Sequence, residues 1–268
     1  MLLVTLACSE SGEKGRGRTG IEKSGCVSLV PSITEIIYAI GADSLLKGNT
    51  AQCDYPLAAQ RVYKVGDFQA PDLERIMALK PGVVFATRPV HNQLIARLKE
   101  LKVRVYVSEP KDIEGVFAEM ESVGRILSHE EQAKRLIDSL KARLKSLPVF
   151  SDTPKVYIEI AIQPLMSIGK GVFINDIICR AGGRNIFGDF PNPYPVVSPE
   201  MVAARNPDVI LILHPGVKAG EVKQRVGWEN IRAVKNGRIY AELDEDLFFR
   251  PGPRVVDGVL LLARLLHQ

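Results

Sequence analysis

The side chains that most often do chemistry are sparse in this chain, and their spacing matches no catalytic motif. The four histidines, His91, His129, His214 and His267, lie far apart, without a partner at a catalytic spacing. Residues 15–20 spell GxGxxG, but the dinucleotide motif needs a strand before it and a helix after it, whereas this stretch is polar. No Walker A, HExxH or GxSxG sequence occurs, and nothing forms the nucleophile–base pair that covalent catalysis requires. These residues give no support for an enzyme.

The cysteines indicate a lipid anchor and free thiols rather than a metal site. Residues 1–7 are apolar and end at Cys8, and residues 9–24 are rich in Gly, Ser, Lys, Glu and Arg. This order is typical of the end of a lipoprotein signal, a lipidated cysteine and a flexible tether. The apolar stretch is shorter than a complete signal and lacks its basic start. We therefore expect the true signal to begin upstream of Met1. If Cys8 is lipidated, Cys26, Cys53 and Cys179 remain, and three cysteines cannot all pair. No two of them lie at zinc-ligand spacing, so the sequence predicts buried free thiols and no metal.

The composition excludes several classes of function. The chain has 268 residues, of which 46% are hydrophobic and 25% charged, as in globular proteins. Its 35 basic and 31 acidic residues give a net charge of only +4, which does not favour nucleic acid as a partner. No apolar run reaches the ~18 residues that a membrane span needs.

A long helix over residues 128–148 is predicted near the middle of the chain. Ser128 with Glu131 suggests a capping box, and Leu140 belongs to an apolar stripe at three- and four-residue spacing. Pro148 would end the helix. Strands and helices alternate on both sides of it, which predicts mostly parallel sheets covered by helices. We therefore expect a tether over 1–25, an α/β lobe over 26–127, a connecting helix over 128–148 and a second α/β lobe over 149–268.

Within these lobes the sequence predicts particular strands and helices. In the first lobe, a strand over 27–30 leads into a helix that Ser32 and Glu35 are expected to cap. Further buried strands are expected at 83–86 and 103–107 in this lobe, and at 156–162 and 209–213 in the second. The chain should finish on an apolar helix over 255–266.

One short internal match links the two lobes. Residues 73–85 read LERIMALKPGVVF and residues 199–211 read PEMVAARNPDVIL. In both, a glutamate is followed seven residues later by a proline and then by an apolar run. Each copy predicts a helix that ends before a proline and leads into a central strand. The match places Glu74 and Glu200 at the start of equivalent helices, either as favourable helix-start acids or as two matched anionic groups on one face.

Several of these segments together resemble a known family. The stretches 29–41 (LVPSITEIIYAIG), 53–56 (CDYP), 65–68 (VGDF), 73–81, 198–209 and 250–254 resemble the helical-backbone periplasmic binding proteins of ABC importers, in order and over almost all of 27–266. That family takes up cobalamin, ferric siderophores and haem, and this sequence is most similar to the cobalamin-binding members. The resemblance implies two Rossmann-like lobes joined by one rigid helix, a largely preformed site between them, and a monomer that delivers its ligand to a permease and its ATPase. It implies no cofactor other than the transported ligand.

The resemblance also implies which residues would bind. Phe68 and Tyr194 match stacking tryptophans and Met166 matches a phenylalanine, whereas Gln52 and Thr87 stand where the cobalamin-binding members have aromatic residues. Asp246 and Arg250 match a polar pair that touches the corrin side chains, and Arg88 and Gln52 also suit the amide groups at the rim of such a ligand. Phe248 is expected at the site as well, with core packing as the alternative for both Phe248 and Phe249. Glu74 and Glu200 match the two glutamates that dock on arginines of the permease.

The ligand is open at this stage. A negatively charged ferric siderophore would favour clustered arginines, which Arg88 and Arg250 could supply. Haem would need an axial side chain, and only Tyr194, Tyr55 or His91 is placed to provide one. A chelatase-type enzyme on a similar two-lobed fold would need a histidine or acid pair in the cleft, and the sequence shows no convincing pair.

Overall fold

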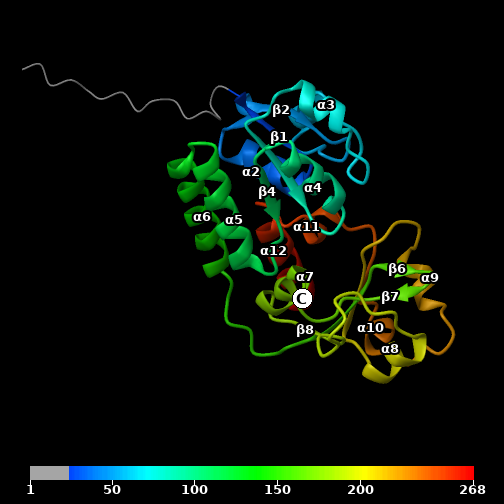
Figure 1. Cartoon of the computed structure of the whole chain (residues 1–268). Coiled ribbons are helices and arrows are strands. Elements are labelled where there is room, and N and C mark those ends of the chain that lie inside the picture. The colour runs from blue at the N-terminus through cyan, green and yellow to red at the C-terminus, as the bar shows by residue number, and fades with distance from the viewer. Residues whose placement is uncertain (1–23) are drawn as a thin grey trace, which may run out of the picture.

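The computed structural model describes residues 24–268, which form two α/β lobes, each built on four parallel strands (Figure 1). Cys8 and the predicted tether lie outside the described residues, apart from the last two tether positions. The elements of the first lobe are β1 (Cys26–Ser28), α2 (Pro31–Ala39), β2 (Leu46–Asn49), α3 (Leu73–Ala78), β3 (Val83–Thr87), α4 (Asn92–Glu100) and β4 (Val105–Ser108), with short 3-10 turns at Asp43–Leu45 and Leu57–Arg61.

The second lobe begins at β5 and carries a small antiparallel hairpin, β6–β7, beside its main sheet. Its elements are β5 (Lys155–Glu159), β6 (Ala161–Ile162), β7 (Leu165–Met166), α7 (Phe173–Arg180), β8 (Arg184–Asn185), α8 (Pro199–Arg205), β9 (Val209–Ile212), α9 (Ala219–Lys223), α10 (Arg232–Lys235) and β10 (Ile239–Tyr240). The chain then forms α11 (Asp246–Phe249) and the apolar α12 (Val255–Leu266). The α/β fold expected from the alternating pattern is confirmed.

The two main sheets share one topology. Their strand orders are β2-β1-β3-β4 and β8-β5-β9-β10, so in each lobe the first and third strands are central and the second and fourth lie at the edges. The internal repeat extends to the backbone: α3 leads into β3 and α8 into β9. Lys80 and Asn206, the residues before the two prolines, both adopt φ = +47°. A left-handed residue ends each helix, because the α region is disfavoured before proline.

The segment between the sheets is a hairpin of two helices, α5 (Ile113–Ile126) and α6 (Glu130–Lys145). The long helix expected near the middle of the chain is α6, and its apolar stripe packs on the core, with Leu140 buried. The capping box expected at its start is wrong: Ser128 has φ = +59° and belongs to the turn, and the helix begins after His129. Helix α5 packs against α2 of the first lobe and α7 of the second, and α6 packs against α12.

One hydrophobic core runs through both lobes. It includes Ile33 and Phe85 of the first lobe, Ile158 and Ile177 of the second, and residues of α5, α6, α11 and α12 between them. Rotating one lobe against the other would expose part of this core to water, so the space between the lobes is largely fixed by packing. Among the described residues, no helix is both long and apolar enough to cross a membrane.

The cysteines differ in part from expectation. Cys26, Cys53 and Cys179 are free thiols, but only Cys26 and Cys53 are buried. Cys179 is exposed because it lies near the end of α7, on the side of that helix away from the core residues Ile174, Ile177 and Ile178.

Candidate functional site

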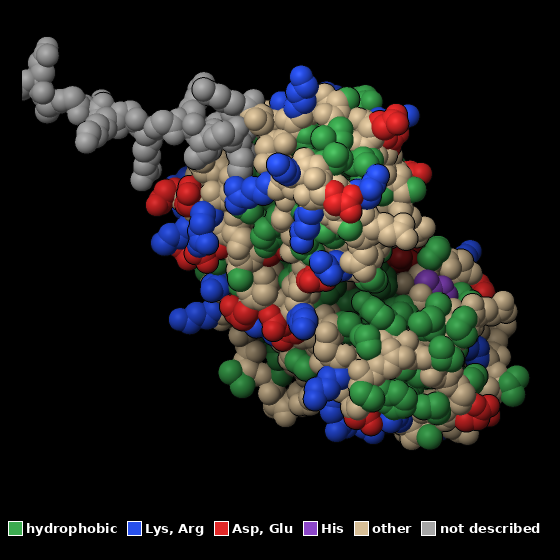
Figure 2. All heavy atoms as spheres, in the orientation of Figure 1, with side chains coloured by type: hydrophobic (Ala, Val, Ile, Leu, Met, Phe, Trp, Pro, Cys, Tyr) green, Lys and Arg blue, Asp and Glu red, His purple; other side chains and the backbone are tan. Residues whose placement is uncertain are grey.

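A cleft of about 760 Å³ lies between the lobes, where the four strands of the first lobe end (Figure 2). Val30 follows β1, Gln52 follows β2, and Thr87 and Ser108 are the last residues of β3 and β4. In open parallel sheets, ligands bind at the carboxyl ends of the strands, where neighbouring connections run in opposite directions. Hydrophobic side chains gather along the second lobe beside this hollow, as Figure 2 shows.

Six of the eight residues predicted to bind ligand line this one cleft. They come from segments far apart in the chain: Gln52, Phe68, Arg88, Tyr194, Asp246 and Arg250. Further lysine, acid and apolar side chains complete the lining, including the exposed Lys111, Glu109 and Phe249 and the half-buried Phe173. The cleft therefore combines aromatic faces with a small number of charged groups at its edge.

Two predicted residues lie elsewhere. Phe248 is 0% exposed and packs in the shared core, and Phe249, 36% exposed, lines the cleft in its place. Both belong to the single turn α11, where consecutive side chains point about 100° apart, so only one of them can face the cleft. Met166 lies on β7, where it pairs with Val196 of the neighbouring loop, and is not part of the cleft lining.

Phe68 is held in place by its neighbours. Its backbone N–H donates to Gln52 Oε1 at 2.6 Å, and its carbonyl oxygen lies 2.6 Å from His91 Nε2. The Thr87 N–H donates to His91 Nδ1 at 3.1 Å, which makes Nδ1 the acceptor and Nε2 the protonated donor. The His91 and Phe68 rings also meet edge to face, with centroids 5.1 Å apart.

His91 is consequently not a ligand-binding histidine. It is buried, and both of its ring nitrogens already make hydrogen bonds to the backbone. Burial lowers the pKa of the His91 imidazole, against the raising effect of its hydrogen bond to Phe68, so the ring is neutral at pH 7. The expectation that His91 is placed to bind haem iron is wrong for this conformation.

Arg250 joins the two sides of the cleft through carboxylates. Its Nη1 lies 2.7 Å from Asp54 Oδ1 and 3.4 Å from Glu35 Oε1, and its Nε lies 2.8 Å from Asp246 Oδ1. Burial raises the pKa of Asp54, but the hydrogen bond and charge of Arg250 outweigh it and hold that pKa below its usual value. The positive charge of Arg250 is thus largely neutralised by the protein itself.

The first turn of α2 differs from expectation. Neither Ser32 nor Glu35 caps the helix; the N-cap is Val30, which has no side-chain cap hydrogen bond. Glu35 is instead buried and binds Arg254 and Arg250, more than 200 residues away in the chain. Ser32 lines the cleft.

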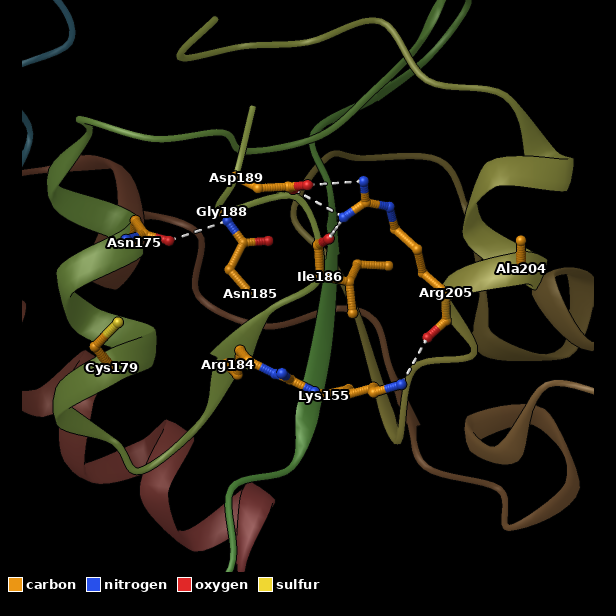
Figure 3. Close-up of a pocket in the computed structure, with 10 residues that line it drawn as sticks. All are labelled: Lys155, Asn175, Cys179, Arg184, Asn185, Ile186, Gly188, Asp189, Ala204 and Arg205. Atoms are coloured by element: carbon orange, nitrogen blue, oxygen red, sulfur yellow. Dashed lines mark hydrogen bonds and ion pairs between the residues drawn. The ribbon is translucent and has the colours of Figure 1, made fainter. Parts of the chain in front are cut away.

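A second hollow, of about 580 Å³, lies in the second lobe between α7, β8 and α8 (Figure 3). Its charges are mostly satisfied internally: Arg205 pairs with Asp189 and donates to the Ile186 carbonyl, and Lys155 Nζ donates to the Arg205 carbonyl at 3.3 Å. None of the predicted binding residues lines it. The cleft between the lobes is therefore the candidate site.

Glu74 and Glu200 lie in separate lobes, in the first turns of α3 and α8. Both are exposed, and the helices that carry them lie at opposite ends of the molecule (Figure 1). The preceding residues Asp72 and Ser198 cap the two helices by accepting backbone hydrogen bonds. The two glutamates therefore occupy equivalent positions, one per lobe.

Several lining residues were missed from the sequence. Ser32, Ser108, Lys111 and Phe173 all line the cleft. The first three follow or end strands of the first lobe, where the rule that ligands bind beyond the carboxyl ends of parallel strands would have singled them out, whereas Phe173 begins α7. No group of histidines, cysteines and acids in the described part of the chain could hold a metal ion. The arrangement suits binding of a broad, partly apolar molecule.

Comparison with known proteins agrees with this geometry. The periplasmic binding protein family matches residues 26–246. The chain is 33% identical over 257 residues to an uncharacterized ABC transporter substrate-binding lipoprotein, YvrC, of Bacillus subtilis, covering 92% of this chain and 81% of that protein. It is 32% identical over 246 residues to a vitamin B12-binding protein of Photorhabdus laumondii, covering 90% of this chain and 87% of that protein.

Solved structures that share this fold include proteins named for binding iron or haem. A possible iron-binding, periplasmic solute-binding protein from Staphylococcus epidermidis superposes with a TM-score of 0.81 at 29% identity, covering 91% of this chain and 99% of that one. A periplasmic haem-binding protein from Pseudomonas aeruginosa superposes with a TM-score of 0.76 at 25% identity, covering 91% and 92%. The relatives are solute-binding proteins and not enzymes. With a cleft between two topologically equivalent lobes and a match over most of its length, the chain belongs to the periplasmic binding protein family of ABC transporters.

Proposed function

We propose that this protein captures a corrinoid in the cleft between its lobes and delivers it to the permease of an ABC importer. The observation that carries the proposal is the pairing of aromatic faces (Phe68, Tyr194 and Phe249) with a polar edge in a single cleft. A corrin is broad and mostly apolar, with amide groups around its rim. Aromatic side chains suit the ring, and Gln52, Arg88 and Asp246 suit the amides. The vitamin B12-binding relative supports the same ligand class.

The two rival ligands fit the lining less well. Haem would need an axial ligand, and with both His91 nitrogens engaged, Tyr194 is the one histidine or tyrosine among the lining residues. A negatively charged ferric siderophore would need unpaired cations, but Arg250 already faces three carboxylates. Arg88 and Lys111 remain for such a ligand.

Ligand identity is tested by titration calorimetry of the protein against cyanocobalamin, cobinamide, haem and a ferric siderophore. We expect corrinoid binding to be tightest. Phe68→Ala and Tyr194→Ala should each weaken it by ~1–3 kcal/mol through lost apolar contact. Tyr63→Ala is the matched control, because Tyr63 is 53% exposed and does not line the cleft. Tight haem binding without corrinoid heat would reverse the assignment.

We further propose that Cys8 is lipidated and tethers the protein outside the cytoplasm. The apolar residues before Cys8 and the polar stretch after it support this assignment. The relative YvrC is itself named a lipoprotein. The test is to express both proteins in a bacterial host with labelled palmitate. We expect the wild-type protein to incorporate the label and Cys8→Ala not to. Equal labelling of both would remove Cys8 as the anchor.

A further inference from the structure

The first turn of α2 opens into the cleft. Val30, Pro31 and Ser32 all line it, directly after β1. Strand β1 lies between β2 and β3, so α2 starts at the point of the sheet where the connections diverge. This is the position at which open α/β sheets present a helix N-terminus to a ligand.

The same turn carries hydrogen-bond donors for which residues 24–268 supply no partner. Pro31 has no N–H, and the helical hydrogen bonds begin with Thr34 N–H donating to the Val30 carbonyl at 3.0 Å. The N–H groups of Ser32 and Ile33 therefore precede the first helical bond, and no side chain caps them. Independently, Ser32 is 1% exposed and its Oγ is buried without a hydrogen-bond partner among the described residues.

A buried, unpaired hydroxyl is unusual, because it forgoes its hydrogen bonds to water without a replacement. Most such groups have a structural or functional explanation. Ser32 lines the cleft, and its hydroxyl lies beside its own backbone N–H, which precedes the first helical bond. Both groups favour the same kind of partner. That partner is an oxygen that accepts hydrogen bonds.

We infer that the first turn of α2, through the Ser32 hydroxyl and the Ser32 N–H, is a subsite for an acceptor oxygen on a side arm of the ligand. The inference rests on the proposed function, and it specifies which part of the ligand this end of the cleft recognises. Either a carboxamide or a carboxylate oxygen has the required lone pairs. The partial positive charge at the helix N-terminus favours both.

Arg250 marks the neighbouring edge of the subsite. It lines the cleft with Pro251, and the following residue, Gly252, packs so closely on Ser32 that a Cβ there would lie 3.3 Å from the Ser32 carbonyl oxygen. The guanidinium uses Nη1 and Nε for its carboxylate partners. A side arm at the start of α2 would therefore lie near a cation whose charge is already balanced, which admits a neutral amide as well as an acid.

The test is Ser32→Ala, compared with wild type by calorimetry against cyanocobalamin, which carries amide arms, and against haem, which carries carboxylate arms. We expect a 3–10-fold loss of affinity for whichever probe the wild type binds, the effect of one lost hydrogen bond. The melting temperature of the ligand-free variant should be unchanged or higher, because the substitution removes an unpaired buried hydroxyl. A ligand subsite predicts this combination of effects, whereas a structural serine predicts lower stability.

Ser122→Ala is the matched control, since its hydroxyl donates to the Ala118 carbonyl within α5, at 2.9 Å, and does not line the cleft. It should leave affinity for both probes unchanged. Wild-type affinity in Ser32→Ala would overturn the subsite and leave the proposed function standing. A lower melting temperature of Ser32→Ala, with unaltered affinity for the probe, would also overturn the subsite, because it would identify Ser32 as a structural residue. If the wild type binds neither probe, the proposed function fails and the subsite fails with it.

Discussion

Glu35 and Arg254 form a bidentate ion pair that joins the first lobe to the last helix of the chain. Arg254 Nη2 and Nε lie 2.7 and 2.9 Å from the two carboxylate oxygens, and the Glu35 side chain is only 2% exposed. The Arg254 guanidinium also lies over the Tyr55 ring, 4.0 Å from its centroid. Because Glu35 is on α2, whose first turn lines the cleft, and Arg254 immediately precedes α12, this pair ties the cleft wall to the last helix of the chain.

Replacing Glu35 should therefore reduce stability strongly. Glu35→Gln keeps the shape of the side chain but leaves Arg254 and Arg250 buried with one compensating charge fewer. Breaking one side of a buried pair costs about 3–5 kcal/mol. Urea denaturation of the purified variant measures the loss. Glu121→Gln is the control, because Glu121 pairs with Arg125 on the surface with both side chains 67% exposed, where a pair contributes ~1 kcal/mol or less. Equal denaturation midpoints for Glu35→Gln and wild type would refute a stabilising role.

His91 should influence ligand binding through the backbone that it holds, chiefly at Phe68, although its second hydrogen bond is to the Thr87 N–H. Its Nε2–H holds the Phe68 carbonyl and its ring contacts the Phe68 ring, so His91→Ala should loosen the loop that presents Phe68 to the cleft. We expect affinity for the proposed corrinoid ligand to fall about 3–10-fold, as for one lost hydrogen bond. In a double-mutant cycle, adding His91→Ala to Phe68→Ala should cause little further loss. Additive losses in calorimetry would show that His91 acts on the ligand by another route.

Glu119 should make stability depend on pH. It is a buried residue of α5, and one carboxylate oxygen, Oε2, has no hydrogen-bond partner among the described residues. Burial raises the pKa of Glu119 from 4.5 to about 7, although a hydrogen bond with Ser108 opposes the shift. Between these values the folded protein keeps a proton that the unfolded chain has lost. Stability from this group is therefore present below pH 4.5 and is lost as pH rises towards 7.

Glu119→Gln mimics the protonated carboxyl group. The variant should therefore not lose stability at this position as the pH rises from 4.5 towards 7. Relative to wild type, the variant should gain stability between pH 5 and pH 8, by up to about 3 kcal/mol. Denaturant unfolding at a series of pH values measures the difference. Glu121→Gln, on the same helix but exposed, controls for the general effect of deleting a carboxylate. Parallel stability curves for Glu119→Gln and wild type would contradict the expected burial effect.

The elements set by local pattern were predictable from the sequence. The apolar stripe of α6 and the two helices that end before Pro81 and Pro207 depend on residues a few positions apart, and the structure confirms them. The grouping of Phe68, Tyr194 and Asp246 in one cleft could not come from spacing; it came from the resemblance to a family. Sequence pattern alone reports neighbours along the chain, whereas the cleft is made of segments that lie up to 221 residues apart, from Val30 to Pro251.

The incorrect expectations have a common cause: each depends on contacts between residues that are distant in the sequence or on the rotation of a side chain about its helix. Ser32 and Glu35 have the types and spacing of helix caps, but a distant arginine engages Glu35, and Ser32 faces the cleft. Phe248 and Phe249 are identical in type, and only their rotation about α11 decides which one is buried. His91 looked free because its partners are backbone atoms of Thr87 and Phe68. Tertiary partners of this kind leave no periodic trace in the sequence.

The last prediction concerns docking to the permease. Glu74 and Glu200 are exposed, occupy equivalent first turns of α3 and α8, and are carried by the two lobes separately. We propose that each meets a basic residue of the permease, which would steer the encounter and fix its orientation. Both carboxylates are at the surface, so Glu74→Lys and Glu200→Lys should leave the melting temperature and ligand affinity almost unchanged.

Each reversal should nevertheless reduce transport, or stimulation of the transporter's ATPase in proteoliposomes, because like charges would then face each other. The double reversal should reduce it further than either single change, since both lobes must dock together. Glu100→Lys is the control: Glu100 is an exposed acid at the end of α4, with a surface partner in Arg97, and it lies outside the repeat. Normal transport by the two reversed proteins, at normal ligand affinity, would reduce Glu74 and Glu200 to acids that stabilise the starts of their helices.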